Sequence, residues 1–294
     1  MTSTDLQLYL DRIGVHGTVR PDLDGLRRVH RAHAESLTYE NLDVQLGVPV
    51  TRDARASFDK IVRRGRGGWC YEMNGLLGWA LEEIGFDVTR LAGAVMRGAF
   101  GDAITGNHLV LLVRLEGKTL IGDVGFGDGL IEPVPLEEGA TNGNPFDCRL
   151  ERLSGGWWRY HNDPRTGGPS FDFNPDVADE GLLESLCQFL QRDPASPFVQ
   201  NAVVQRWKDG AHWSLRGRVL RVLTPACEEK SLVASAEEYV GTLKSAFNLD
   251  LPAAASLWPK ICARHEEFFA DKDPLNEAPA MSVDDVRAAF ARRE

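Results

Sequence analysis

The segment from Arg64 to Asn74 contains the cysteine with the strongest candidate chemistry. Gly67, Gly68 and Trp69 precede Cys70, and apolar residues at helical spacing follow it, so Cys70 is predicted to lie in the first turn of a helix. Unpaired amides and the helix dipole there favour an anion, lower the pKa of a thiol and can bind the oxyanion of an acyl transfer. The two glycines are expected to adopt conformations closed to other residues and to let another molecule approach. Cys70 is therefore a candidate nucleophile, and a small buried apolar side chain is the competing interpretation.

A nucleophilic cysteine needs a base, and the base needs a group that orients it. His108 begins a predicted strand that turns back at Glu116 and Gly117. A two-residue loop there sets the register and places His108 opposite Gly125, so that Asp123 lies on the same face within side-chain reach. The hairpin therefore predicts a His108–Asp123 pair. The alternative is a solvent-facing histidine at a strand start and an aspartate before a glycine-rich turn.

The remaining histidines and cysteines have weaker contexts. His30 and His33 fall on the apolar stripe of a predicted helix, where packed or partly exposed side chains are expected. Polar surroundings without an evident partner are typical of His16, His161, His212 and His265. Structural roles are expected for Cys148, Cys187, Cys227 and Cys262. The loop 125–129 is rich in glycine but lacks the Lys-Ser/Thr of a phosphate-binding loop, so its glycines are interpreted as an exit from the strand.

The order of predicted elements indicates an α+β chain. Helical patterns run from residue 4 to about 86, with Ser57 as a possible N-cap of the third helix. Short apolar strands separated by glycine-rich turns follow to about 225, namely 88–96, 108–115 and 118–124 among others, and a helix interrupts them at about 180–191. The end of the chain returns to helix, with capping signals at Ser235 and Ser282. Such an order differs from the alternation expected of a parallel α/β sheet.

Composition excludes several classes of protein. The 294 residues include 33 Lys and Arg against 43 Asp and Glu, a formal net charge of −10, which argues against nucleic-acid or anionic-membrane binding. No apolar run approaches the roughly 18 residues of a membrane span, and the first ten residues show no signal pattern. The five cysteines include no C-x-x-C pair, so neither a disulfide framework nor a metal site is expected. These features predict a cytoplasmic protein.

The motifs around these residues together resemble the arylamine N-acetyltransferase family. They are RGGWCYEMN around Cys70, the histidine at a strand start, GDVGFG from Gly122, and LTYENL from Leu37. The resemblance runs in order to about residue 135. It implies a papain-like or transglutaminase-like catalytic core in an α+β fold. The implied parts are a helical bundle over 1–86, an antiparallel β-barrel-like domain over 87–200 and an α/β lid over 201–294.

The resemblance also implies a reaction and the residues that perform it. Cys70 would be the nucleophile, His108 the base and Asp123 the orienting carboxylate. Acetyl would pass from acetyl-CoA to the cysteine and then to an arylamine, arylhydrazine or N-hydroxyarylamine, with no permanently bound cofactor. The enzyme would be a monomer or weak homodimer.

Binding residues follow from the same resemblance. Thr105 and Gly106 would contact CoA, Phe126 would line the acceptor pocket and Val95 would be a pocket residue, although core packing is an equal alternative for the last two. Arg64 and Glu40 match motif positions, and either could form an ion pair that supports the cysteine loop instead of contacting substrate. The loop before His108 has little positive charge, so cations for the CoA phosphates are expected in the last third of the chain.

Three other functions remain open. An amide synthase with the same triad would take its acyl chain from a carrier protein and would not be acetylated by acetyl-CoA. A papain-like hydrolase would turn over with water and gain nothing from an amine. A catalytically inactive binding module would carry a Cys70 that fails to react with a small alkylating agent.

Overall fold

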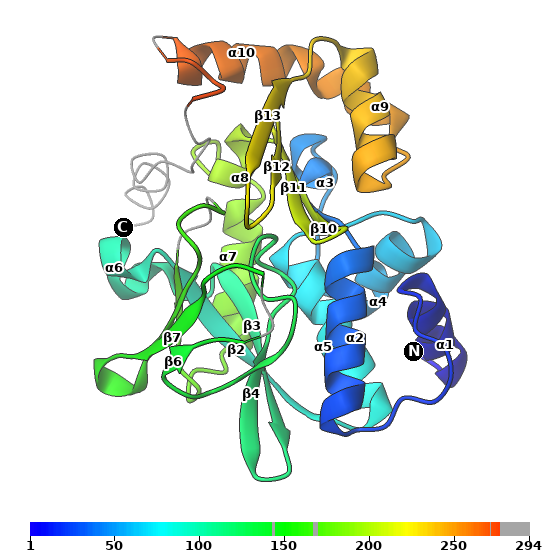
Figure 1. Ribbon diagram of the computed structural model, residues 1–294, viewed down its shortest axis with the longest axis vertical. Helices are drawn as coiled ribbons and strands as arrows, with labels where there is room; N and C mark the ends of the chain where they lie inside the picture. Colours follow the sequence, from blue (N-terminus) through cyan, green and yellow to red (C-terminus); the bar gives the residue numbers. More distant parts are fainter. Residues whose placement is uncertain (143–144, 167–169, 271, 277–294) are drawn as a thin grey trace.

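A computed structural model describes residues 1–142, 145–166, 170–270 and 272–276. Figure 1 shows the N-terminal helices on one side of a curled sheet, and a second sheet with two helices at the top of the molecule. All strand pairs among the described residues are antiparallel. The predicted α+β class is confirmed.

The N-terminal part consists of helices and one short strand. Its elements are α1 (Ser3–Arg12), α2 (Leu23–Ser36), β1 (Tyr39–Glu40), α3 (Leu42–Gln45), α4 (Ala54–Phe58), the π-helical segment η1 (Asp59–Arg63) and α5 (Cys70–Ile84). The side chain of Asp22 accepts from the Gly25 N–H and begins α2. Asp53 begins α4 in the same way, so the prediction of Ser57 as an N-cap is wrong: Ser57 lies inside the helix.

Helix α5 begins at Cys70, as predicted, and ends at Ile84; Gly85 caps it with a φ of 110°, which only glycine adopts without strain. Its stripe of Met73, Leu77 and Leu81 is buried in the core that α5 shares with α1 and α2. Near the start of the helix, Cys70 belongs to a second core cluster, formed with strand β2 and helix α7. The helix therefore carries the cysteine into the contact between two parts of the fold.

The curled sheet has eight strands in the order β5-β4-β3-β2-β9-β8-β7-β6. In chain order the elements are β2 (Asp87–Val95), α6 (Arg97–Phe100), η2 (Gly101–Ile104), β3 (His108–Leu115), β4 (Lys118–Gly122), β5 (Val134–Pro135), β6 (Gly139–Ala140), β7 (Arg149–Arg152), η3 (Ser154–Gly156), β8 (Trp158–His161), β9 (Phe171–Phe173), α7 (Glu180–Leu190) and α8 (Pro197–Gln200). The predicted strands and the predicted helix at 180–191 are confirmed to within two residues.

The β3–β4 hairpin has the predicted two-residue loop. Glu116 and Gly117 have φ of 52° and 76°, the left-handed pair that a type I′ turn needs. Leu115 pairs with Lys118, and this register continues to Leu111 opposite Gly122. The predicted register is therefore confirmed, although the ladder ends before it reaches His108.

The second sheet joins the end of the chain to its beginning. Its order is β1-β10-β11-β12-β13, and its C-terminal elements are β10 (Val203–Lys208), β11 (Ala211–Arg216), β12 (Val219–Leu223), β13 (Glu228–Leu232), α9 (Ala236–Phe247), η4 (Pro252–Leu257) and α10 (Trp258–Phe269). Ser235 caps α9 as predicted, and Ser282 lies outside the described residues. Strand β1, which sequence patterning did not predict, pairs with β10 and brings Tyr39 close to the start of α5. In the described part of the chain, no helix combines the length and the apolar composition that a membrane crossing requires.

Candidate active site

Cys70 lies at the floor of a pocket that both sheets help to form. Its side chain is buried, and it lines the pocket together with His108. The two glycines before it have a different role from the one expected. Neither has a positive φ, and a Cβ on Gly67 would lie 2.0 Å from the carbonyl oxygen of Thr38, while one on Gly68 would lie 2.8 Å from the Glu72 side chain. Glycine is needed because the chain itself packs there.

The thiol does not become an anion through its helix position alone. Burial raises the pKa of the Cys70 thiol well above its ordinary value, and the backbone N–H groups of Leu109 and Tyr71 lower it by a smaller amount. The predicted lowering by the helix start is therefore outweighed by desolvation. A nearby base must take the proton before this sulfur can attack a carbonyl carbon.

The His108–Asp123 pair predicted from the hairpin is present. His108 Nε2 lies 2.6 Å from Asp123 Oδ2, and both side chains are buried. The His108 ring packs edge-on against Phe126, with ring centroids 5.4 Å apart, and at 4.9 Å from Phe171. The Nε2 bond leaves Nδ1 as the ring nitrogen that can exchange protons in the pocket. No hydrogen bond joins Cys70 to His108 in the part of the chain that the structure describes.

Asn74 explains why the β3–β4 ladder ends early. Beyond Leu111–Gly122 the hairpin register would pair Val110 with Asp123 and then Leu109 with Val124. At the Leu109–Val124 position, the Asn74 amide lies between the two strands. Its Nδ2 donates to the Leu109 carbonyl oxygen at 2.6 Å, and its Oδ1 accepts from the Val124 N–H at 2.8 Å. Nδ2 also donates to Asp123 Oδ1 at 2.8 Å. Sequence reasoning assigned Asn74 no role, although a polar residue one helical turn after the cysteine was a usable signal.

Asp123 is held by more than Asn74 and His108. The Gly125 N–H donates to its Oδ1 at 2.8 Å, and its own N–H donates to His30 Nε2 at 3.0 Å. Gly125 must be glycine, because a Cβ there would lie 2.8 Å from the Cys70 Cα. The expectation that His30 is packed is correct, but the stripe pattern gave no sign that the ring reaches the candidate site.

A buried cluster of charged side chains packs against the loop 64–69, which precedes Cys70. Lys60 contacts Asp43 at 3.0 Å and Glu72 at 2.9 Å, and Arg66 contacts Glu40 at 2.7 Å and Asp43 at 2.9 Å. Burial raises the pKa of Glu72 to about 7, against the opposing effect of Lys60. Glu72 also accepts from the Trp69 N–H at 3.2 Å, which ties the loop to the cluster.

This cluster corrects one residue of the sequence analysis. The partner of Glu40 is Arg66, whereas Arg64 is exposed. The ion pair expected for Glu40 is therefore present with Arg66, and none is found for Arg64 among the described residues. The loop 64–69 is not helical, so periodicity could not tell which arginine side chain turns inward.

The comparison with known proteins identifies the family. The family model described as N-acetyltransferase matches residues 22–256, which is most of the chain. The chain belongs to this N-acetyltransferase family.

Individual relatives agree with the family match. The chain is similar to an arylamine N-acetyltransferase of Mycolicibacterium smegmatis, with 38% identity over 265 residues that cover 84% of this chain and 92% of the relative. It is also similar to arylamine N-acetyltransferase 1 of Homo sapiens, with 31% identity covering 90% of this chain and 99% of the relative. Among solved structures, the Mycobacterium marinum arylamine N-acetyltransferase in complex with CoA matches with a TM-score of 0.78 and 34% identity, covering 89% of this chain and 98% of the other.

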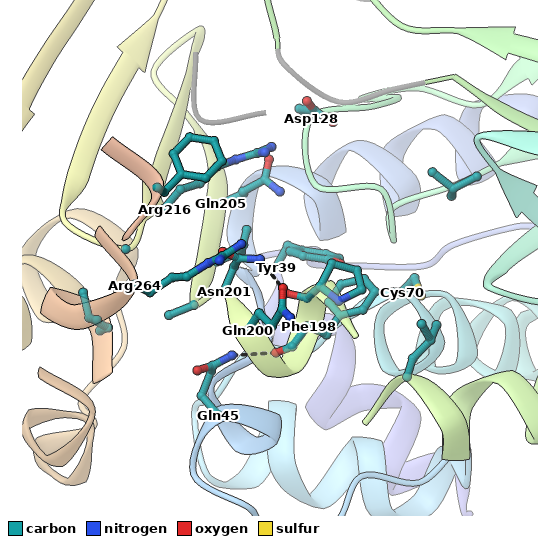
Figure 2. Close-up of a pocket in the computed structure, with 18 of the residues that line it drawn as sticks. Tyr39, Gln45, Cys70, Asp128, Phe198, Gln200, Asn201, Gln205, Arg216 and Arg264 are labelled. Carbon is teal, nitrogen blue, oxygen red and sulfur yellow. Dashed lines mark hydrogen bonds between the residues drawn. The ribbon is translucent and has the colours of Figure 1, made fainter. Parts of the chain in front are cut away.

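The pocket of this N-acetyltransferase family member has an aromatic and apolar inner part. Figure 2 shows Tyr39 and Phe198 close to Cys70. Val95 and Phe126 line the pocket, as the resemblance implied. Thr105 and Gly106 are not part of the described lining: Thr105 is buried, and a Cβ on Gly106 would lie 2.9 Å from the Leu182 carbonyl group. Their contact with CoA stays a prediction.

The outer part of the same pocket carries positive charge. Arg216 of β11 and the α10 residues Lys260 and Arg264 line it, with Asp128 as the acidic residue of the described lining. His265 of α10 also lines it, but burial lowers the pKa of its ring, which is therefore neutral at pH 7. In Figure 2, Arg216 and Arg264 lie on the opposite side of the pocket from Cys70. The C-terminal third of this acetyltransferase-family chain therefore supplies the cations near the site. The described residues include no group of three histidine, cysteine or acidic side chains placed to hold a metal ion.

Proposed function

We propose that this chain is an arylamine N-acetyltransferase that uses a thioester on Cys70. It takes acetyl from acetyl-CoA and transfers it to the nitrogen of aromatic amines, hydrazines or N-hydroxyarylamines. The observation that carries the proposal is the pocket that Cys70 and His108 both line, with His108 Nε2 bonded to the Asp123 carboxylate. The relatives named arylamine N-acetyltransferase support the reaction, and they do not favour the carrier-fed amide synthase.

In the first half-reaction, His108 Nδ1 takes the proton of the Cys70 thiol, and the sulfur attacks the carbonyl carbon of acetyl-CoA. The carbon–sulfur bond to CoA breaks, and the imidazolium returns the proton to the CoA thiolate. Asp123 accepts from Nε2 and stabilises the imidazolium while it exists. The Leu109 and Tyr71 N–H groups, which already act on the sulfur, are the candidate donors to the developing negative charge.

In the second half-reaction, the aromatic amine attacks the thioester carbon. His108 takes one amine proton, the bond between the carbonyl carbon and Cys70 breaks, and the proton returns to the sulfur. Weakly basic aromatic amines are neutral near pH 7 and can therefore act as nucleophiles in this step. Phe126 and Val95 are the proposed walls of the acceptor site, because both line the pocket that contains the sulfur.

We further propose that the CoA phosphates lie against the cations of α10. Lys260 is suitable for a test, because no ion pair occupies it among the residues described and its side chain lines the pocket. Lys260→Met should raise the KM for acetyl-CoA about fivefold, since an exposed charge pair contributes roughly 1 kcal/mol. The KM for S-acetylpantetheine, which lacks the nucleotide phosphates, should not change. Lys244→Met is the matched control, because Lys244 lies on α9 in an exposed pair with Asp250.

The central test is the mass of the intact protein after mixing with acetyl-CoA. The expected result is one acetyl adduct, absent from Cys70→Ala, that disappears when an aromatic amine is added while the N-acetyl product forms. Loss of the adduct in water at the same rate would indicate a hydrolase. An alkylatable Cys70 that gains no acetyl group would refute the proposal and point to a carrier-bound donor.

Other features belong to the same proposal. We propose a cytoplasmic enzyme that is a monomer or weak homodimer, with no permanently bound cofactor. The proposed parts are the helical bundle over 1–86, the domain over 87–200 that carries His108 and Asp123, and the lid over 201–294. Limited proteolysis and sedimentation of the full chain would test the boundaries and the oligomeric state.

A further inference from the structure

His30 joins two segments of chain beside the candidate catalytic residues. It lies in α2 and is fully buried. Its Nδ1 donates to the carbonyl oxygen of Ile131 at 2.9 Å, since a carbonyl can only accept. Its Nε2 accepts from the backbone N–H of Asp123 at 3.0 Å. These two bonds define the tautomer with the proton on Nδ1.

The imidazole of His30 takes the place of a strand pairing. Strands β4 and β5 pair at Leu120–Pro135 and Ile121–Val134, and their ladder ends there. The same register would continue by placing Asp123 opposite Glu132, with the Asp123 N–H directed toward the partner chain. The ring of His30 lies across this position and holds both chains through its two nitrogens. The segment that carries Asp123 is therefore fixed by a side chain from a helix about ninety residues earlier in the chain.

This bond differs from the other bonds that hold Asp123. Asn74, Gly125 and His108 all donate to its carboxylate oxygens. His30 is the partner of its backbone N–H. The carboxylate can meet His108 Nε2 at 2.6 Å only while the backbone position is maintained, and a buried N–H without a partner would favour a shift of the chain.

The charge state of His30 suits this role. Burial lowers the pKa of His30 to about 4, and the opposing effects of Asp123 and Glu132 are smaller, so the ring is neutral at pH 7. A neutral ring can accept from the N–H through Nε2. It also leaves the Asp123 carboxylate to His108, because a second cation beside it would compete with the imidazolium of the reaction.

We propose that His30 is a positioning residue of the transfer reaction, which holds the main chain of Asp123 so that its carboxylate is aligned with His108. The inference rests on the roles proposed above for Asp123 and His108. His30 itself touches no substrate in this scheme. Its removal should lower the rate of chemistry more than it changes the binding of acetyl-CoA.

The test compares His30→Leu with His33→Leu in the full chain. Both residues are buried on α2, and His33 bonds Tyr9 at 2.8 Å instead of a residue of the site, so His33→Leu is a control for lost packing and a lost buried bond. The measurements are the melting temperature, the single-turnover rate of Cys70 acetylation with its dependence on acetyl-CoA, and the rate of Cys70 alkylation by iodoacetamide from pH 5 to pH 9. The alkylation rate does not depend on acetyl-CoA.

His30→Leu should slow acetylation about tenfold to a hundredfold, the range expected for one unsatisfied buried group, with KM changed less than twofold. Its alkylation profile should shift toward higher pH, because a misplaced Asp123 stabilises the imidazolium less. His33→Leu should lose comparable thermal stability but keep the rate and the profile. Equal rates and profiles in the two folded variants would overturn the inference. A wild-type protein that gains no acetyl group would refute the proposed function instead, while the alkylation profiles would still decide the role of His30.

Two further variants separate the two bonds of the ring and serve if His30→Leu does not fold. His30→Gln can reach the Nε2 position with its amide oxygen and accept from Asp123, whereas His30→Asn can reach only the Nδ1 position and donate to Ile131. The expected result is a faster acetylation rate in His30→Gln than in His30→Asn at equal melting temperature. The reverse order would mean that the Ile131 bond matters and would overturn the proposed role.

Discussion

Replacing Asp123 by asparagine tests the proposed triad, because the hydrogen bonds to the Asp123 carboxylate leave only one orientation for the new amide. Asp123 Oδ1 accepts from both Asn74 Nδ2 and the Gly125 N–H, while Oδ2 accepts from His108 Nε2. An asparagine at this position must keep its oxygen where the two donors converge. Its NH2 group then faces His108 and forces Nε2 to accept, so the imidazole proton moves to Nδ1.

The expected loss can be estimated in two parts. A charge-assisted hydrogen bond contributes roughly 1.5–3 kcal/mol, so its loss alone would slow the reaction about tenfold to a hundredfold. The wrong tautomer adds more, because an Nδ1 that already carries a proton cannot take one from Cys70. Together these effects should slow acetylation by roughly 10³- to 10⁴-fold.

Rapid-quench acetylation followed by intact mass measures this rate, and iodoacetamide alkylation from pH 5 to pH 9 reports the thiolate. In Asp123→Asn, alkylation should rise only at high pH, since burial raises the pKa of the Cys70 thiol and no base opposes this shift. Asp87→Asn, an exposed carboxylate at the far end of β2, is the control. A loss of only tenfold to a hundredfold would refute the tautomer argument, and a wild-type rate would refute the role of Asp123.

Three further results are expected. Cys70→Ser should keep the fold, but its rate of acetyl transfer from acetyl-CoA to an arylamine should fall on the order of a thousandfold, because a serine hydroxyl is a weaker nucleophile. A rate within tenfold of the wild type would contradict the proposed thioester. Lys60→Met should lower the free energy of unfolding by about 3–5 kcal/mol in urea melts at pH 8, and by less at pH 5.5, because burial already raises the pKa of Glu72 to about 7; equal losses would contradict this. Burial lowers the pKa of His212 to about 3. Below about pH 6.5, His212 is therefore protonated in the unfolded chain but not in the folded one. The free energy of unfolding falls as the pH falls, and the contribution of His212 to this loss is about 2 kcal/mol at pH 5. His212→Leu should lose this part of the pH 7-to-5 decrease in unfolding free energy, and an undiminished decrease would contradict the argument.

Local rules were sufficient to predict the His108–Asp123 hydrogen bond. A two-residue loop at Glu116 and Gly117 determines the register of the whole hairpin, and the register determines which side chains share a face. His108 and Asp123 could therefore be paired by counting residues. The start of α5 at Cys70 could also be predicted from nearby residues alone, since it depends on where an apolar stripe of period 3.6 begins.

Apart from Asn74, which lies one helical turn after Cys70, the groups that hold this pair in place could not be found by counting residues. Periodicity identifies which face of α2 is buried, but it does not say what lies opposite that face. His30 was therefore expected to be a packed side chain, whereas it bonds a strand end about ninety residues later. The pairing of β1 with β10 is more remote still, since it places Tyr39 opposite Gln205. In the loop before Cys70, Arg64 and Arg66 could be distinguished only by the structure, because no repeating geometry governs their directions.

The contacts that hold Asp123 can be explained by the burial of the Cys70 sulfur. A helix start alone would favour the Cys70 thiolate, but desolvation outweighs it and raises the pKa of the thiol. In the proposed reaction, the thioester on Cys70 must be kept away from water until it reaches an amine, so exposing the sulfur to lower its pKa would promote hydrolysis. The remaining way to activate the sulfur is a base whose charged form is stabilised inside the same pocket. That requirement falls on Asp123, and it explains why its carboxylate and its main chain are held by four separate hydrogen bonds, from His108, Asn74 and Gly125 to the carboxylate and from its own N–H to His30.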